Sequence, residues 1–170
     1  TSTLSVSAIY IQRILDVQSQ WRVDGQGQVF CSLNVKKNPA TPFLPRFGVR
    51  LFMPSSMDRV KYFGYGPYES YVDKRRASYL GVFESKVEDM HEDYIKPQEN
   101  GSHYGCQWLT VQGEQGTLKV EAQNQHFSFN ASQYTQEMLT DAMHNFELEK
   151  SEYSVLCLDY VQSGIGSNSC

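Results

Sequence analysis

The feature that most constrains the fold of this chain is a period-two alternation of apolar residues that recurs along most of its length. Between residues 15 and 23 the odd positions carry the apolar side chains, and the even positions are polar. Successive side chains of a strand point to opposite faces, so this segment is predicted to be a strand with one face toward a core. Residues 29–35 repeat the pattern after Asp24-Gly25, where we expect a tight turn with positive φ at the glycine. The two segments predict a β-hairpin with one buried side.

The same alternation predicts further strands, which Gly- and Pro-bearing turns separate. We expect them at residues 47–53, 60–63, 78–84, 106–111, 117–122, 126–130, 146–148 and 154–162. The segment Asn38–Pro45 contains three prolines, which cannot donate the hydrogen bonds of a sheet. It is therefore predicted to be a crossover loop and not a domain linker.

One segment has the pattern of a short helix. Thr135 can cap its first turn and Glu137 lies within that turn. The apolar side chains that would share one face are Met138, Leu139, Ala142 and Met143. With at most one or two short helices among many strands, the predicted fold class is all-β, an antiparallel β-sandwich.

Composition limits the classes of partner. The chain has 170 residues, which suits one domain with a real core, and 40% of them are hydrophobic. A net charge of −4 argues against nucleic acid as the main partner. No apolar stretch approaches the roughly 20 residues of a membrane-spanning helix, and no secretion signal is visible at the first residues. The basic cluster at residues 74–76 is expected to be a solvated loop edge or an ion-pairing site.

The four cysteines lack the close spacing of a metal site or a redox motif. Three of the four lie in strand-like patterns, so the cysteines are predicted to be buried free thiols. Free thiols favour a reducing, cytoplasmic setting. The four are Cys31, Cys106, Cys157 and Cys170.

The four histidines also show no shared spacing for metal ligands, and each is predicted to lie on the surface or in a loop. They are His91, His103, His126 and His144.

Two loops, at residues 64–75 and 94–101, are dense in Gly, Pro, aromatic rings and carboxylates. Loops of this composition hold a defined shape for a specific task. Their candidate site residues are Gly64, Gly66, Pro67, Glu69, Tyr71 and Asp73 in the first loop and Pro97, Glu99, Asn100 and Gly101 in the second.

The carboxylates of these loops allow two interpretations. Glu69 and Glu99 could contact a sugar or act in catalysis, or they could anchor the loops by accepting backbone N–H groups or pairing with Arg. The anchoring role is the commoner one in proteins, and the same holds for Asp73 beside its basic neighbours.

The loop tyrosines allow a similar choice. They could stack on sugar faces or plug one end of the sandwich with their hydroxyls bonded. They are Tyr68, Tyr71 and Tyr94.

In this order along the chain, the two loops resemble the signature loops of the C-terminal β-sandwich domain, or small chain, of β-galactosidases in glycoside hydrolase family 2. The first loop of that family reads G-x-G-P-x-E-N-Y-x-D-R, and here Ser70 replaces the Asn and Lys74 stands at the Arg. The second, Pro97-Gln98-Glu99-Asn100-Gly101, matches directly. Weaker similarity covers residues 21–27, 45–50, 127–134 and 158–166.

The resemblance implies a supersandwich fold like that of galactose mutarotases, with residues 1–170 forming a single partial domain truncated at both ends. It also implies part of an enzyme that hydrolyses terminal β-D-galactosides such as lactose. In the family both catalytic glutamates lie on a separate barrel domain. This chain is therefore expected to scaffold the enzyme and edge its active site, with no catalytic residue of its own and no hydrolysis in isolation.

The resemblance further implies a substrate rim at the last loop, whose residues are Ser167, Asn168, Ser169 and Cys170. Well-known members carry a Trp near the galactose where Cys170 stands here. No cofactor is expected in this chain, whereas Mg and Na are expected in the other domains of the parent enzyme. Expected partners are the catalytic barrel domain or large subunit, the galactoside substrate and further copies in a homo-oligomer, with neither nucleic acid nor a membrane.

Two other functions stay open at this point. A free-standing carbohydrate-binding or aldose-mutarotase-like protein would bind galactose by itself. A purely structural assembly domain would bind no sugar.

Overall fold

The computed structural model describes residues 2–6 and 14–163. The chain divides into two compact units, Thr1–Leu44 and Pro45–Cys170. The boundary falls inside the segment predicted to be a crossover loop and not a linker. A single partial domain over residues 1–170 stays a prediction, and each unit is described here by itself.

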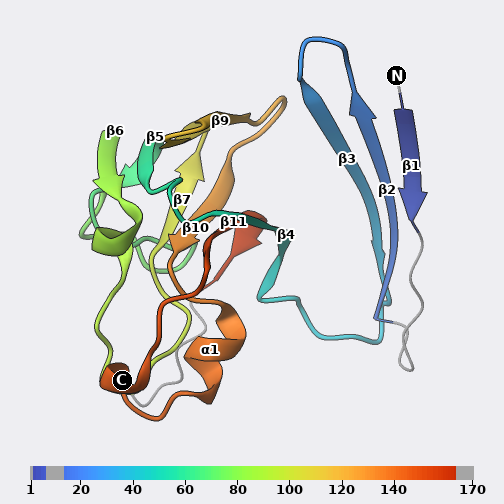
Figure 1. The fold of residues 1–170 in the computed structure, drawn as a ribbon. Coiled ribbons are helices and arrows are strands. Elements are labelled where there is room, and N and C mark those ends of the chain that lie inside the picture. Colours follow the sequence, from blue (N-terminus) through green and yellow to red (C-terminus); the bar gives the residue numbers. More distant parts are fainter. Residues whose placement is uncertain (1, 7–13, 164–170) are drawn as a thin grey trace. The chain divides into compact units, whose positions relative to one another are not determined.

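The first unit is a three-stranded antiparallel sheet in the order β1-β2-β3, the blue strands of Figure 1. Its strands are β1 (Ser2–Val6), β2 (Leu15–Val23) and β3 (Val29–Lys37). The predicted hairpin is confirmed, because Val17 lies opposite Val35 and Trp21 lies opposite Cys31 across β2 and β3. Such cross-strand pairs are the contacts that stabilise a two-stranded ribbon.

Two details of the hairpin differ from the prediction. The positive φ, 79°, belongs to Gly27 and not to Gly25, because the Asp24 carboxylate accepts the backbone N–H groups of Gln26 and Gln28 and widens the turn. In addition, no side chain of β2 or β3 is buried, and Cys31 is exposed. One sheet has no second layer of its own to cover a face.

The second unit contains two four-stranded antiparallel sheets (Figure 1). The first has the order β4 (Arg46–Pro54), β11 (Tyr153–Gln162), β10 (Phe127–Ser132) and β7 (Ser102–Cys106). The second has the order β6 (Tyr79–Lys86), β5 (Arg59–Gly66), β8 (Trp108–Gly113) and β9 (Gly116–Glu121).

The core lies between these two sheets. Tyr62 on β5 meets Phe129 on β10 with ring centroids 4.9 Å apart in an edge-to-face arrangement, so the inner faces of the two sheets touch. Most of the other buried apolar side chains of the core come from the strands of both sheets: Met53, Val60, Cys106, Leu109, Val111, Phe127, Ala131 and Leu156. The predicted all-β sandwich is confirmed.

The strand expected at residues 106–111 is in fact two strands. Cys106 ends β7 in one sheet, and Trp108 begins β8 in the other. Gln107 lies between them, and its backbone N–H donates to the Phe63 carbonyl of β5 at 2.9 Å. Cys106, Leu109 and Val111 all face the same core, but the buried positions change from even to odd numbers between Cys106 and Leu109. The alternation is therefore interrupted where the chain passes from one sheet to the other.

The predicted helix is present but shorter than expected. Helix α1 (Gln136–Asp141) begins with the Thr135 hydroxyl accepting the Met138 N–H at 3.2 Å. It ends before Ala142 and Met143, so these two residues do not belong to its face.

The strand expected at residues 146–148 is wrong, because a 3₁₀ turn, η2 (Asn145–Glu147), lies there. The Glu147 carboxylate accepts the backbone N–H groups of Met143 and His144 and closes this turn. A second 3₁₀ turn is η1 (Val87–Met90). Among the described helices, none combines the length and the apolarity needed to cross a bilayer.

Candidate functional site

The Glu69 carboxylate joins the two loops that the sequence singles out. One oxygen, Oε2, accepts the Tyr71 hydroxyl at 2.9 Å and the Gly101 backbone N–H at 3.0 Å. The other, Oε1, accepts the Lys74 ammonium at 2.8 Å and the Tyr94 hydroxyl. The sequence analysis singled out all four of these donor residues, and two of them, Gly101 and Tyr94, lie in the second loop. Glu69 therefore ties the first loop to the second.

The hydrogen bonds around Glu69 keep its carboxyl group ionised. Burial alone would raise the pKa of this carboxyl group, but the hydrogen bonds from Lys74, Tyr94, Gly101 and Tyr71 hold the pKa below its ordinary value. Burial together with the neighbouring Glu69 carboxylate raises the pKa of Tyr71, so its hydroxyl stays protonated and donates. With a carboxylate that already accepts four donors, Glu69 has the geometry of an anchor and not of a proton donor.

The second loop is closed by Asn100. Its side-chain oxygen accepts the Glu92 N–H at 3.1 Å, and its side-chain nitrogen donates to the Gln98 carbonyl at 2.9 Å. The Asn130 side chain of β10 donates to the Asn100 backbone carbonyl. Gly101 follows with φ at 71°, where an added Cβ would lie 2.4 Å from the Met90 carbonyl oxygen. Only glycine fits this position without displacing backbone.

Arg46 links the second loop to the end of β11. Its guanidinium pairs with Asp159 through two hydrogen bonds of 2.8 and 2.9 Å and also forms an ion pair with Glu99. Burial raises the pKa of the Asp159 carboxyl group, and the bonds from Arg46 oppose that rise. A bidentate Arg–carboxylate pair fixes orientation as well as charge. Glu99 thus has the Arg partner that the anchoring interpretation requires.

The other predicted loop residues lie around these two anchors. Gly64 and Gly66 are buried at the end of β5, and Pro67 and Asp73 are exposed. Pro97 is buried within the second loop. The predicted rim, Ser167 to Cys170, lies outside the described residues.

The three candidate tyrosines have different environments. The hydroxyls of Tyr71 and Tyr94 both donate to Glu69. These bonds agree with the interpretation in which the tyrosine rings close one end of the sandwich with their hydroxyls hydrogen-bonded. Tyr68 is exposed. Of the basic cluster, Lys74 pairs with Glu69, and Arg75 places its guanidinium 4.8 Å from the Tyr104 ring centroid.

His103 contradicts the prediction for the histidines. It is buried in the sandwich, stacked on Phe129, with Nδ1 within 2.9 Å of the Tyr62 hydroxyl oxygen. Burial lowers the pKa of His103 to about 4, so the ring is neutral near pH 7. Its position inside β7 next to Ser102 and Tyr104 carries no apolar signature, which is why the sequence did not reveal it. Cys106 and Cys157 are buried free thiols, as predicted.

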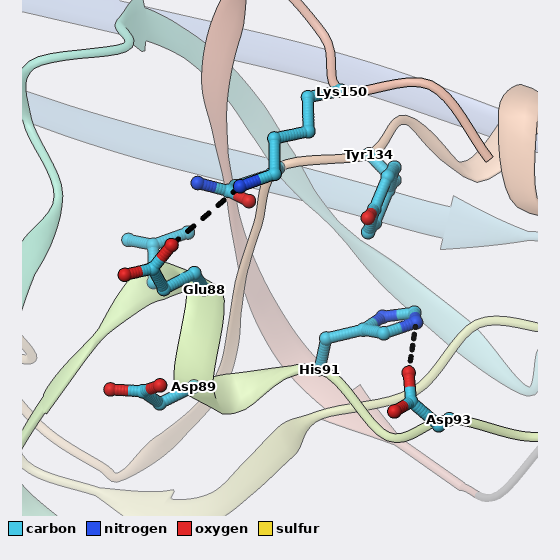
Figure 2. Close-up of a pocket in the computed structure, with 8 residues that line it drawn as sticks. Glu88, Asp89, His91, Asp93, Tyr134 and Lys150 are labelled. Carbon is cyan, nitrogen blue, oxygen red and sulfur yellow. Dashed lines mark ion pairs between the residues drawn. The ribbon is translucent and has the colours of Figure 1, made fainter. Parts of the chain in front are cut away.

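A polar pocket of about 340 Å³ lies beside the second loop (Figure 2). Lys150 Nζ lies 3.6 Å from Glu88 Oε2, and His91 Nε2 lies 3.7 Å from Asp93 Oδ1. The His91 ring is 4.9 Å from the Tyr134 ring, and its Nδ1 is 3.4 Å from the Asn100 amide nitrogen. The full lining is Val87, Glu88, Asp89, His91, Asp93, Gln133, Tyr134 and Lys150.

The sequence did not single out this pocket, because its side chains come from three separated segments that follow no motif. The only local signal was the run of acidic residues around His91. Within residues 2–6 and 14–163, no three His, Cys, Asp or Glu side chains are grouped as a metal site requires. The polar groups of the pocket could hold a polar or cationic group.

Comparison with known proteins identifies the family. The family described as β-galactosidase small chain matches residues 1–170. A β-galactosidase of Actinobacillus pleuropneumoniae is 49% identical over 158 residues, which cover 93% of this chain and 15% of that protein. Those of Staphylococcus xylosus and Streptococcus thermophilus are 39% and 32% identical, over 88% and 96% of this chain and 15% and 17% of the relatives.

The match covers nearly all of the chain, whereas the chain spans only about 15% of the length of these relatives. Both signature loops, joined in space by Glu69, lie within the matched residues. The chain therefore belongs to the family of β-galactosidase small chains.

Proposed function

We propose that this chain is the small-chain part of a β-galactosidase that hydrolyses terminal β-D-galactosides such as lactose. The observation that carries the proposal is the match of the whole chain to this family, whose relatives bear the name β-galactosidase. The catalytic glutamates, and the Mg and Na sites, belong to the rest of the enzyme, which is the main partner of this chain. The enzyme is cytoplasmic and homo-oligomeric in this proposal.

The role of the chain is to hold the substrate rim, residues 167–170, at the edge of the active site. Three contacts converge on the last described residues before that segment. Arg46 holds Asp159 near the end of β11. The Val72 N–H of the first loop donates to the Gln162 carbonyl at 3.3 Å, and the Ser163 N–H donates to the Pro45 carbonyl at 3.0 Å. Both signature loops thus support the end of β11, and this supports a scaffolding role.

The rim is tested in the full-length enzyme with the double variant Ser167→Ala, Asn168→Ala. Loss of hydrogen bonds to the galactoside, at roughly 1 kcal/mol each, is expected to raise KM for nitrophenyl galactoside about tenfold or more. The matched control, Gln115→Ala in the exposed turn between β8 and β9, is expected to leave KM unchanged. If the rim variant has the same KM as the parent enzyme, residues 167 and 168 do not contact the substrate.

A further inference from the structure

Two loops of the second unit lie side by side next to the polar pocket. They comprise residues 91–97 and 142–148. The Asn145 side chain donates to the Asp93 carboxylate at 2.8 Å, and its oxygen lies 3.2 Å from His91 Nε2. Further along, Lys96 Nζ lies 3.8 Å from the Met143 sulfur. These contacts join the two loops into one continuous surface, and we call it the two-loop surface.

The two-loop surface carries unusually exposed apolar side chains. Ile95 is 91% exposed and Phe146 is 84% exposed, the highest values among the exposed large hydrophobic residues that the structure describes. Met143, which contacts Lys96, is 58% exposed. Ile95 and Phe146 each stand next to a residue that joins the two loops, Lys96 and Asn145, and exposed apolar side chains on such a surface mark sites of protein–protein contact. Covering them would release about 25 cal/mol for each Å² of apolar area removed from water.

The pocket beside these side chains has an excess of negative charge. Its lining includes three carboxylates, Glu88, Asp89 and Asp93, against one lysine, Lys150. Figure 2 shows Glu88 paired with Lys150 and Asp93 with His91, whereas Asp89 stands without an ion pair in the view. An acidic pocket next to an apolar patch fits a partner segment that carries a basic side chain next to apolar ones.

We propose that the two-loop surface, together with Asp89 of the pocket, docks the rest of the parent β-galactosidase polypeptide. The occupant is a segment with an Arg or Lys that enters the pocket and an apolar side chain that covers Ile95 and Phe146. About 85% of the length of the relatives lies outside this chain, so a large partner surface exists in the same protein. The inference rests on the proposed function.

A chain of contacts joins the two-loop surface to the Glu69 site. His91 lines the pocket and also contacts the Asn100 side chain. The backbone N–H of Gly101, next to Asn100, donates to the Glu69 carboxylate. A partner that holds residues 91–97 therefore also holds the loop that Glu69 ties to the first signature loop.

The test measures how accessible the surface is in the full-length enzyme. Ile95→Cys and Phe146→Cys are made separately, and each thiol is labelled with a maleimide in the native enzyme, with labelling counted per site by peptide mass spectrometry. The control is Gln115→Cys, an exposed residue of the turn between β8 and β9. We expect labelling at positions 95 and 146 to be at least tenfold slower than at position 115, and to become equal after denaturation.

Equal labelling rates in the native enzyme would overturn the proposal. Slow labelling that becomes fast when the oligomer is diluted into single chains would also overturn it, because a second copy would then be the cover. Hydrolysis of nitrophenyl galactoside is measured in the same preparations. An active enzyme with fast labelling refutes the docking surface alone, whereas an enzyme without turnover refutes the proposed function.

The charge of the pocket is tested separately by Asp89→Asn and Asp89→Lys in the full-length enzyme. If a basic side chain occupies the pocket, the Lys variant places a like charge beside it and weakens docking. Labelling of Cys at position 95 is then expected to become at least fivefold faster in the Lys variant, and to become faster by a smaller factor in the Asn variant. Unchanged labelling in both variants would contradict a basic occupant.

Discussion

At the scale of single residues, the chemistry of the loop carboxylates could be predicted, but their partners could not. A Gly- and Pro-bearing loop needs acceptors for its backbone N–H groups, and Glu69 and Glu99 supply them or pair with a cation, as composition suggested. The donors lie far away in sequence: Gly101 is 32 residues from Glu69, and Arg46 reaches Glu99 from the start of β4. Only the folded chain brings them together.

Replacing Glu69 with Ala is expected to destabilise the chain by about 3 kcal/mol, because the buried Tyr71 hydroxyl and the Gly101 N–H both lose their acceptor. Urea unfolding at pH 7 measures the change. The control Glu114→Ala, in an exposed turn, is expected to stay within about 0.5 kcal/mol of the parent.

The lowered pKa of Glu69 also sets a pH window. Its contribution to stability is complete above the ordinary pKa of 4.5 and is lost as the pH falls through the lower native value. Equal stability of the parent and Glu69→Ala at pH 7 would show that the carboxylate is not an anchor.

Buried His103 makes the chain sensitive to mild acid. Burial lowers the native pKa from 6.5 to about 4, so between these values the unfolded chain binds a proton that the native chain does not. The free energy of unfolding is therefore expected to decrease as the pH falls from 6.5 to 4, by up to about 1.4 kcal/mol per pH unit. Urea titrations at several pH values measure this slope.

The variant His103→Gln is expected to lose that slope, whereas the exposed control His126→Gln is expected to keep it. A slope that survives in His103→Gln would assign the acid sensitivity to another group.

At the scale of elements, the alternation of apolar and polar residues predicted strands well where a segment belongs to one sheet only. The hairpin of β2 and β3 and the long strand β11 follow directly from it. It failed at Gln107, where the chain changes sheets while its side chains still face one core, and at residues 146–148, where backbone bonds to Glu147 favour a 3₁₀ turn. The failure at residues 146–148 depends on contacts that local spacing does not contain. The failure at Gln107 left a local signal, because the buried apolar positions change from even to odd numbers between Cys106 and Leu109.

Gly101 is the position at which the second loop is expected to tolerate change least. Gly101→Ala places a Cβ against the Met90 carbonyl oxygen at a φ of 71°, so we expect a loss of about 2 kcal/mol or more in thermal or urea unfolding. The control Gly25→Ala, where nothing lies within 4 Å of the added Cβ and φ is not positive, is expected to be neutral or slightly stabilising. Equal effects at the two positions would contradict the proposed close approach.

At the scale of the whole molecule, the fold class and the family were within reach of the sequence, because the sandwich needs only strand patterns and the two signature loops keep their order. The sequence did not predict the division of the chain at Leu44, the pocket at His91 or the two-loop surface. Each depends on which segments meet in space. The rim at residues 167–170 stays a prediction, since it lies outside the described residues.

The measurement that most directly tests the central claim is turnover of nitrophenyl galactoside by the purified 170-residue chain, alone and mixed with the remainder of its parent enzyme. We expect no turnover above background from the chain alone, none from the remainder alone, and hydrolysis when the two are combined. Turnover by the isolated chain would place the reacting acids within these residues and contradict the claim.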